Sequence, residues 1–575
     1  MTAQKGSLQS EAMKNTLNPT GLAKRLDAAA TRVLAHFEGR LLRTLPFLLA
    51  LAVVAHVLLS GETYWATNDD GHMAMIAHGY GMTDTPSPGI VYSNVIWGWM
   101  VMHLGVAGLQ GYSVGAFAAM ILSCLVLSLA LYRSPAPAWA GAALIVMMFV
   151  PSLTNMQFTI TAGFLAVAAI ALLLTARRED GAWLWFTVAV SLLLSALVRL
   201  DECVFVLLLA VPFCAMRWRR ETDRLLRRRA AATLGIALLA IGACSALNRS
   251  YYSGDRWDTF LEMNSLRRPF SDYGLTQYYT ANRAELAGSG VSVNDLRLID
   301  QRAFLDTGFF TAARLQPLID KVTAGQRIRF NLRRWREAVR PFGQLSMCAS
   351  LLVLLLAIIA GRRREAAMLA TLMFAGVTLC FWLWGRPGIV HIYVPAEAAL
   401  AAFAMIGVEW RFRLLLPVAG AALFIVASVM AWRIGIVTQR DSMHAVRHVE
   451  TACALPKDQL LVVWGPPALN ERQLYRPLSP VGGECGLQLY FINTLSLLPG
   501  TLDKLYAYTH GKPLIEALRD GQPFTLLSDA GRIGLLKLYF DSHYGETLTA
   551  TPLALDGSSR AYLLRTTPPG TAAQH

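Results

Sequence analysis

Long hydrophobic runs, separated by short polar stretches rich in arginine, dominate the chain. A helix needs about 20 apolar residues to cross a bilayer, and runs close to that length recur along the sequence. The pattern predicts a polytopic α-helical membrane protein with about eleven spans. We expect these spans at residues 44–60, 112–132, 136–152, 157–175, 183–199, 203–216, 230–247, 343–360, 366–384, 392–408 and 414–432.

One further apolar stretch, residues 90–108, is predicted not to cross. It contains Asn94, His103 and several glycines, and it follows the turn Pro86-Ser87-Pro88-Gly89. If the basic N-terminus is cytoplasmic and 90–108 does not cross, every arginine-rich loop falls inside, as the positive-inside rule requires. These loops carry Arg133, Arg177-Arg178, the segment 217–229, Arg362-Arg363-Arg364 and Arg411/Arg413. We therefore expect a re-entrant or surface-lying segment at 90–108.

This topology divides the chain into three parts. Residues 1–40 form a cytoplasmic segment without a cleavable signal peptide, and residues 41–435 form the membrane module with external loops 61–111 and 248–341. Residues 436–575 are predicted to form a soluble α/β domain on the outer side. The expected elements of that domain are strands at 460–464, 523–527 and 561–564, and a helical stretch at 496–519.

Composition supports the membrane assignment, because 54% of the residues are hydrophobic and only 16% are charged, against about 25% charged in soluble domains. The net charge of +14 follows from the arginine loops, so no nucleic acid partner is expected. Six cysteines lie in or beside apolar segments and are expected to pack there. Cys453 and Cys485 lie in the polar tail, and a disulfide between them is expected if the tail is exported.

Two adjacent carboxylates, Asp69 and Asp70, follow the first span in the string Ala66-Thr67-Asn68-Asp69-Asp70-Gly71-His72. One carboxylate can act as a general base. Because two negative charges side by side repel, the pKa of one member of the pair is expected to be raised. Alternatively, Asn68 or Asp69 caps a helix that begins near residue 70, with Asp70 favourable to the helix dipole. Residues 73–80 are predicted to form a short amphipathic helix on the membrane surface.

The first span, the outward acidic pair, the surface helix, the further spans and the exported C-terminal domain together resemble the GT-C superfamily of membrane glycosyltransferases. That superfamily includes protein O-mannosyltransferases, the lipid A aminoarabinose transferase and mycobacterial arabinosyltransferases. The string Asn68-Asp69-Asp70-Gly71 looks like the acidic motif of their first external loop, and the layout covers residues 40–435. The resemblance implies a sugar donor linked to polyprenyl phosphate, with Asp69 as base and Asp70 as second acid; the reverse assignment stays open. The tail has no WWDYG-like string, which argues against transfer of a whole oligosaccharide to Asn.

Other charged residues at the same outer face are candidates for binding the donor phosphate or sugar. In Arg199-Leu200-Asp201-Glu202, Arg199 would face the phosphate and Glu202 the sugar or a metal; alternatively, these charges pair internally. In the insert, Arg267 and Arg268 suit phosphate, and nearby aromatics suit sugar rings or the membrane interface. The candidate aromatic and polar neighbours are Trp257, Phe260, Asn264 and Asp272-Tyr273.

The string Arg386-Pro387-Gly388-Ile389-Val390-His391-Ile392-Tyr393 offers a third group. Arg386 would neutralise phosphate, with His391 or Tyr393 donating to it; alternatively, the string anchors lipid headgroups. His72 and His78 flank the acidic pair, but two histidines six residues apart do not share a helix face. No metal site is therefore expected, and no cofactor is required, although a divalent cation stays compatible with the chemistry.

The sequence thus predicts an enzyme of the bacterial inner membrane that moves a sugar from a polyprenyl-phosphate donor to an acceptor hydroxyl on the outer face, with inversion expected. The acceptor is a glycan, a lipid or a protein, and membrane lipid is the other expected partner. Two alternatives remain: a transporter or flippase, and a non-catalytic assembly protein for envelope glycans. The spans are poor in mid-membrane charge, which favours surface chemistry over passage.

Overall fold

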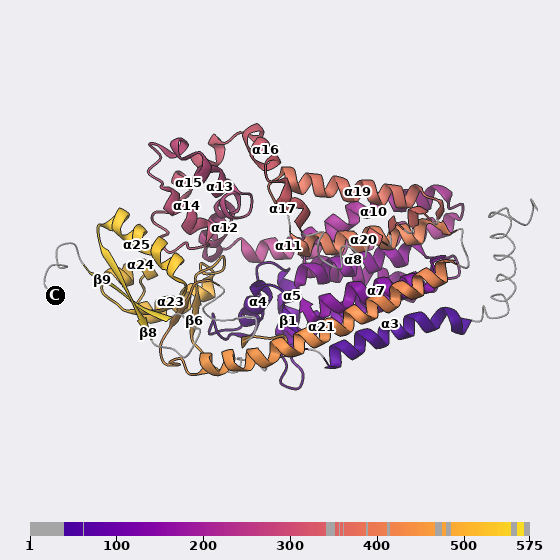
Figure 1. Ribbon diagram of the computed structural model, residues 1–575, viewed down its shortest axis with the longest axis horizontal. Helices are drawn as coiled ribbons and strands as arrows, with labels where there is room; N and C mark the ends of the chain where they lie inside the picture. The colour runs from indigo at the N-terminus through magenta and orange to yellow at the C-terminus, as the bar shows by residue number, and fades with distance from the viewer. Residues whose placement is uncertain are drawn as a thin grey trace, which may run out of the picture.

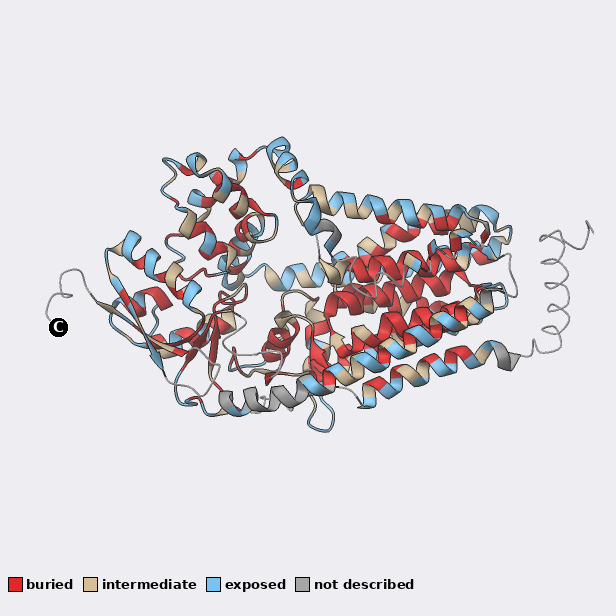
Figure 2. Ribbon diagram, viewed as in Figure 1, coloured by how far each residue is buried: buried red, intermediate tan, exposed pale blue. Residues whose placement is uncertain are grey.

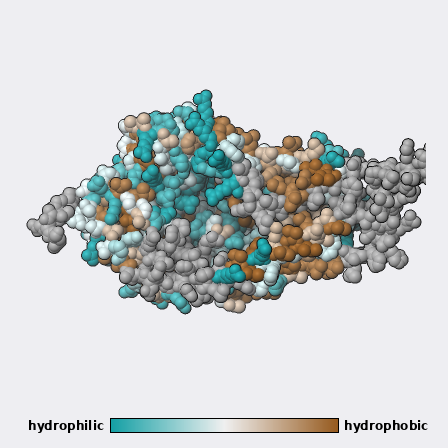
Figure 3. Space-filling view, viewed as in Figure 1, coloured by the Kyte–Doolittle hydropathy of each residue, from teal (hydrophilic) through white to brown (hydrophobic). Residues whose placement is uncertain are grey.

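The computed structural model describes residues 40–60, 62–340, 351–352, 354–355, 357–359, 361–386, 389–410, 415–465, 474–478, 485–553 and 561–567. A bundle of long helices makes up one half of the molecule, and an insert and a C-terminal region lie at one end of it (Figure 1). Hydrophobic residues gather over the bundle, and hydrophilic residues gather over the other half (Figure 3). The protein is therefore mostly helical, and on this face its apolar surface is concentrated on the bundle.

The bundle contains ten described helices. They are α3 (Arg40–Ser60), α6 (Gly111–Arg133), α7 (Ala138–Thr154), α8 (Phe158–Leu174), α9 (Ala182–Val198), α10 (Leu200–Arg220), α11 (Arg224–Tyr252), α19 (Glu365–Leu383), α20 (Val390–Gly407) and α21 (Leu415–Cys453). Six helices of the described chain have segments long and apolar enough to cross a membrane, and α7, α8 and α9 are shorter apolar helices. Every residue of α8 is buried, so α8 is the centre of the bundle (Figure 2). The expected span at 343–360 lies largely outside the described residues.

Arginines gather at one end of the bundle, which we call the arginine end. Arg43 of α3 donates to the carbonyl oxygen of Ser134 after α6, and Arg133 pairs with Asp180 before α9 at 2.6 Å. Arg217 of α10 donates to the carbonyl oxygen of Leu174 at the end of α8. Side chains from successive loops therefore meet at this end, and Asp69 and Asp70 lie at the opposite end.

The apolar stretch 90–108 forms only a short helix, α5 (Val95–His103), of nine residues. At about 1.5 Å per residue it is far shorter than the roughly 30 Å bilayer core. Asn94 caps it by accepting a hydrogen bond from Ile96 N, and the Asn94 amide donates to the carbonyl oxygen of Cys244 in α11. The backbone N–H of Asn94 also donates to the carbonyl oxygen of Leu197 in α9. The segment is thus tied to the ends of two long helices.

The helix that carries the acidic pair, α4 (Asn68–His78), does not lie on the membrane surface, and the prediction of an amphipathic surface helix is wrong. Residues Asp70 to Ala77 are all buried. A helix buried on all sides needs neighbours on all sides, and α4 is enclosed by the bundle on one side and the C-terminal region on the other (Figure 1). It begins after Thr67, so neither Asn68 nor Asp69 is the capping residue.

The insert between α11 and α19 is helical. Its α-helices are α12 (Asp258–Ser271), α13 (Leu275–Ala281), α14 (Val293–Asp300), α15 (Ala312–Lys321), α16 (Ala324–Leu332) and α17 (Trp335–Val339). It also contains two short 3₁₀ helices, η1 (Asp255–Trp257) and η2 (Arg283–Leu286). Helices α16 and α17 lead the chain back toward α19 (Figure 1).

The C-terminal region contains a five-stranded sheet in the order β6-β5-β7-β9-β8. Strands β6 (Leu489–Phe491), β5 (Leu461–Val463) and β7 (Phe524–Leu527) are parallel, and β9 (Ala561–Thr567) and β8 (Thr547–Leu553) are antiparallel. The expected helical stretch 496–519 is split into α23 (Pro499–Thr509) and α24 (Leu514–Arg519), and α25 (Ala530–Tyr544) follows. Helix α21 runs unbroken from the bundle to Cys453, so it connects the two halves rigidly.

The C-terminal region holds the loop that follows α4. Leu489 N donates to the carbonyl oxygen of Gly81, and Lys504 Nζ donates to the same oxygen at 2.5 Å. The Lys504 ammonium, whose side chain is 1% exposed, also pairs with Asp84 at 2.9 Å. A buried charge stays stable only with such partners, so this contact fixes loop and sheet together.

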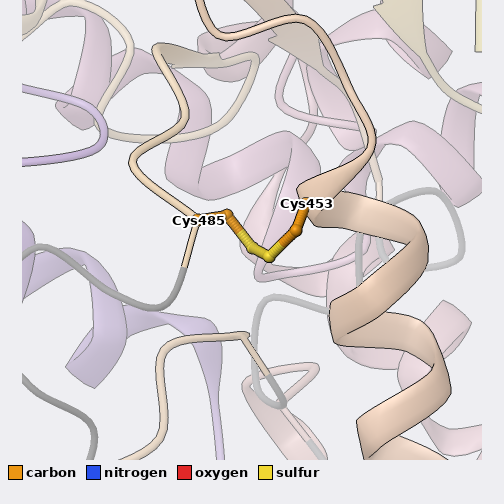
Figure 4. The surroundings of a disulfide bond; sticks show 2 residues. All are labelled: Cys453 and Cys485. Atoms are coloured by element: carbon orange, nitrogen blue, oxygen red, sulfur yellow. A yellow bond between two sulfur atoms is a disulfide. The ribbon is translucent and has the colours of Figure 1, made fainter.

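The expected disulfide between Cys453 and Cys485 is present, and it joins the end of α21 to the segment that enters β6 (Figure 4). Cross-linking residues 32 positions apart restricts the unfolded chain, which is expected to stabilise the fold by roughly 3–4 kcal/mol.

We predict that replacing both cysteines by serine lowers the midpoint of thermal unfolding of the purified protein by several degrees, and that a reducing agent does the same to the unmodified chain. Cys380→Ser is the control, because Cys380 is an exposed free thiol. An unchanged midpoint in the double variant would contradict a stabilising role for the disulfide.

Candidate active site

Asp70 is an anchor between α4 and the bundle. Its Oδ1 accepts hydrogen bonds from the hydroxyl of Tyr112, at the start of α6, and from the backbone N–H of Phe158, the first residue of α8, both at 3.0 Å. Its Oδ2 lies 3.5 Å from the hydroxyl of Thr67. The side chain is 1% exposed. Burial raises the pKa of Asp70 well above its ordinary value, and the charge of Asp69 raises it further, while these hydrogen bonds oppose the shift.

Asp69 lies in a different environment, although it is the next residue of the same helix. It is half-buried, and none of the described residues donates a hydrogen bond to its carboxylate. It occupies the first turn of α4, where the helix dipole favours a negative charge. Asp69 therefore has an ionisable group that is accessible and not engaged, whereas Asp70 is committed to structure.

Tyr92 is the neighbour that connects Asp69 to the arginines. It follows a tight turn in which Tyr92 N donates to the carbonyl oxygen of Ile90 at 2.8 Å, and the central residue, Val91, has φ 68°. A β-branched residue with positive φ is strained, and such strain persists only where surrounding contacts impose it. One such contact is a hydrogen bond from Val91 N to the hydroxyl of Tyr252, at 2.9 Å.

Charges from two regions act on the Tyr92 hydroxyl. Burial raises the pKa of Tyr92 and the charge of Asp69 raises it further, whereas Arg267, Arg302 and a hydrogen bond with Thr494 lower it. Arg267 comes from α12, Arg302 follows α14, and Thr494 follows β6. The membrane module, the insert and the C-terminal region thus each contribute a side chain around Tyr92.

Arg267 is buried and held in place by its neighbours. Its guanidinium donates to Asp272 at 3.1 Å and to Asn264 at 2.7 Å. Burial lowers the pKa of Arg267, and Asp272 opposes that shift. Arg386 lies 4.0 Å from the other oxygen of Asp272 and stacks over the ring of Tyr273 at 5.3 Å. One carboxylate therefore faces two guanidinium groups, which leaves the pair with an excess positive charge.

Arg199 and His391 extend this cluster across the bundle. The guanidinium of Arg199 lies 4.9 Å from the ring centre of Phe158, and that ring stacks on Tyr92 at 6.0 Å. The charges of Arg199 and Arg386 both act on the His391 imidazole. We call Arg199, Arg267, Arg302 and Arg386 the arginine ring. Together with Asp69, Tyr92 and His391, it is the candidate site.

Three predicted site residues lie elsewhere. Arg268 is exposed, because it is one residue along α12 from Arg267 and points away from the buried face. Glu202 is buried in the bundle, where Oε1 lies 3.2 Å from the position that a Cβ of Gly163 would take, and Gly163 is itself packed against Pro395 of α20. Tyr393 is 1% exposed and its ring packs against Phe381 of α19 at 5.7 Å.

The two histidines beside the acidic pair face opposite ways. His78 accepts a hydrogen bond from Tyr112 N at 3.2 Å through Nε2. Burial lowers the pKa of His78, which suits a neutral acceptor. His72 instead packs on the ring of Phe491 at 4.7 Å and lies 3.4 Å from the Asn493 amide. In the described part of the chain, no group of three or more His, Cys, Asp and Glu residues is placed to hold a metal.

Sequence reasoning missed Tyr92, Arg302 and Thr494. Tyr92 follows the Pro/Gly-rich turn that had been noted only as a boundary. Arg302 has φ 61°, a left-handed conformation that is uncommon for a residue with a side chain, and nothing in its neighbours' identities indicates it. Thr494 comes from a domain that is nearly 400 residues away along the chain, so only the tertiary fold brings it to the site.

No family model matches this chain, and no curated protein matches it. Two solved structures are similar. One is ArnT from Cupriavidus metallidurans in the apo state, at 13% identity and a TM-score of 0.37, covering 93% of this chain and 98% of that one. The other is ArnT from the same organism bound to undecaprenyl phosphate, at 13% identity and a TM-score of 0.35, covering 92% of this chain and 99% of that one.

The identity and the TM-scores are too low to assign chemistry to individual residues of this chain. The function proposed below therefore rests on the side chains of the candidate site.

The two aspartates are expected to respond differently to substitution. Asn at position 70 keeps an acceptor for Tyr112 and Phe158, whereas Ala leaves the buried N–H of Phe158 unpaired, at a cost of about 1–3 kcal/mol. We therefore predict that Asp70→Ala lowers the thermal unfolding midpoint clearly, while Asp70→Asn folds and stays close to the unmodified protein.

The raised pKa of Asp70 also predicts how the stability of the protein changes with pH. Because the folded pKa of Asp70 is raised, its neutral form is favoured in the fold, and stability is lost as the pH rises above the ordinary value of 3.8. Asp70→Asn cannot ionise, so its unfolding midpoint is expected to gain on that of the unmodified protein as the pH rises. If the unfolding midpoint of Asp70→Asn instead fell relative to that of the unmodified protein as the pH rises, a buried, neutral Asp70 would be contradicted.

Proposed function

We propose that this protein is a glycosyltransferase that moves a sugar from a polyprenyl-phosphate donor to an acceptor hydroxyl at the outer face of the membrane. The observation that carries the proposal is the pairing of one accessible, unengaged carboxylate, Asp69, with the arginine ring at the same end of the bundle. A base for the acceptor and a positively charged site for a phosphate leaving group are the two parts that this transfer needs.

Asp69 is the better general base of the two acids. A base must be ionised and must reach the proton that it removes. Asp69 is half-buried and accepts no hydrogen bond from the described chain, whereas Asp70 has its Oδ1 occupied by two donors and a raised pKa. The proposal therefore assigns the base to Asp69 and gives Asp70 a positioning role.

The arginine ring is suited to a lipid phosphate. Guanidinium groups bind phosphate oxygens in a fixed fork geometry and keep their charge at all working pH values. Arg267 and Arg386 share only Asp272, so their combined charge is not cancelled within the group. A monophosphate leaves with two negative charges, and these would be balanced by the arginine ring without a divalent cation.

The proposed reaction is a single displacement. The acceptor hydroxyl attacks the anomeric carbon of the sugar, and Asp69 takes the hydroxyl proton. The bond between the anomeric carbon and the phosphate oxygen breaks, and the polyprenyl phosphate leaves with the bonding electrons. Attack opposite to the leaving group inverts the anomeric configuration. The prenyl chain stays in the bilayer while a polar acceptor approaches from the insert and the C-terminal region.

Cellular placement forms part of the proposal. With the arginine end in the cytoplasm, the candidate site, the insert and the C-terminal α/β domain face the periplasm of a bacterial inner membrane. The Cys453–Cys485 disulfide is compatible with that oxidising compartment.

Asp69→Asn tests the base directly. The substitution keeps size and removes the proton acceptor, so turnover is expected to fall by about 10²–10⁴ while the unfolding midpoint stays unchanged. The measurement is release of polyprenyl phosphate in proteoliposomes supplied with a panel of polyprenyl-phosphate monosaccharides and crude envelope acceptors. Full turnover by Asp69→Asn would reject the mechanism.

Glu397→Gln is the matched control for that experiment. Glu397 is a buried carboxyl in α20, and neither of its oxygens has a hydrogen-bond partner in the described chain. It is an ionisable residue inside one of the expected spans, where few such residues were predicted. A transferase that works at the outer end should tolerate Glu397→Gln, whereas a transporter that moves its substrate through the bundle would need Glu397 and tolerate Asp69→Asn.

The two adjacent arginines of α12 test the phosphate site. Arg267→Gln removes a guanidinium from the arginine ring and is expected to lower kcat/KM by about 10²–10³. Arg268→Gln removes the same charge from the exposed face and is expected to leave kcat/KM within about twofold, since exposed charges contribute little. Equal losses in the two variants would show that overall charge, and not this site, supports the reaction.

A further inference from the structure

A second pocket lies at the arginine end of the bundle, at the opposite end from Asp69. It has a volume of about 280 Å³ and is formed where α6, α8, α10, α19 and α20 end or begin. Four arginines line it, namely Arg133, Arg177, Arg217 and Arg220, and Glu365 is the one carboxylate among its lining residues. Topology alone explains why arginines lie at this end, but it does not explain a cavity among them.

Two of these arginines are already neutralised. Arg133 pairs with Asp180 at 2.6 Å, and Arg217 pairs with Glu221 at 2.5 Å. Arg177 and Arg220 are exposed and form no ion pair within the described chain. Set against Glu365, these two leave one positive charge in the pocket.

Apolar side chains line the pocket beside the arginines. They include Phe213 and Met216 of α10 and Phe403 of α20. One to two turns further along, the outer faces of the flanking helices are apolar and uncovered: Val211 of α10 is 59% exposed and Met368 of α19 is 54% exposed. The pocket is therefore open to a ligand that has an anionic head and a hydrocarbon tail.

We propose that this pocket binds the headgroup phosphate of an anionic phospholipid from the cytoplasmic leaflet, with the acyl chain lying along α10 and α19. A headgroup of net charge −1 matches the single excess positive charge, whereas a zwitterionic headgroup leaves it uncompensated. A soluble phosphate would leave the apolar lining uncovered, so the lipid-borne form is the one that suits both the charged and the apolar lining of the pocket.

This lipid site does not depend on the transferase activity. It lies at the other end of the bundle and shares no residue with the candidate active site. If the lipid experiment contradicted the lipid site, the proposed function would still stand. If Asp69→Asn kept full turnover, the lipid site would still stand.

The test measures thermal unfolding of the full-length protein in detergent while lipid is titrated. Palmitoyl-oleoyl phosphatidylglycerol is expected to raise the unfolding midpoint of the unmodified protein, and palmitoyl-oleoyl phosphatidylcholine and glycerol 3-phosphate are not. Arg177→Gln/Arg220→Gln is expected to weaken the phosphatidylglycerol response about thirtyfold in apparent affinity, from roughly fivefold per arginine near a lipid headgroup.

Arg219→Gln/Arg228→Gln is the charge-matched control. Both residues are exposed at the same end of the bundle and neither lines the pocket, so the control should respond as the unmodified protein does. Met216→Trp provides a variant that keeps every charge and fills the cavity, and it too should lose the response.

Four outcomes overturn the proposal. The first is a full response in the pocket variants, and the second is an equal loss of response in the control. The third is an equal effect of phosphatidylcholine and phosphatidylglycerol, which would remove the charge argument. The fourth is the same shift with glycerol 3-phosphate alone, which would make the ligand a free phosphate ester and not a lipid.

Discussion

The contact between Asp70 and the ends of α6 and α8 is the constraint on which the candidate site depends. One carboxyl oxygen accepts from both Tyr112 and Phe158, and α8 is the most enclosed helix of the bundle. These two hydrogen bonds therefore fix the position of α4 relative to the most enclosed part of the bundle. Because Asp69 is the preceding residue on the same helix, its carboxylate takes a fixed place beside Tyr92 without any bond of its own. In the proposed mechanism, the general base Asp69 is thus positioned through its neighbour Asp70.

Enclosure of α4 gives the C-terminal region a direct part in the site. The sheet contacts the loop after α4 through Leu489 and Lys504, and the segment after β6 brings Thr494 to Tyr92. A domain that only guided an acceptor could be joined by a flexible linker. Here α21 runs continuously from the bundle to Cys453, and the disulfide closes the connection. Rigid attachment is what preorganisation of a site assembled from three regions requires.

The sequence was a good guide to whatever depends on local pattern. Apolar runs located most of the described long helices, the Pro/Gly turn and Asn94 separated α5 from them, and single apolar runs marked β5, β7 and β9. It was a poor guide wherever a residue's role depends on distant partners. Residues 73–77 are apolar enough for either a membrane surface or a protein interior, and only the docked sheet decides between them. Arg267 and Arg268 are identical in type, and the helical rotation of about 100° between them decides which is buried.

The arginines at the two ends of the bundle differ in how they are paired with carboxylates. At the arginine end, Asp180 and Glu221 neutralise Arg133 and Arg217 at close range, whereas other arginines such as Arg219 and Arg228 are exposed to solvent. At the other end, Asp272 is shared by Arg267 and Arg386, and Arg199 faces an aromatic ring instead of a carboxylate. Arg267 and Arg386 therefore have one carboxylate between them, and positive charge is in excess at this end. An excess of this kind supports the proposed donor, because an anionic phosphate would balance it.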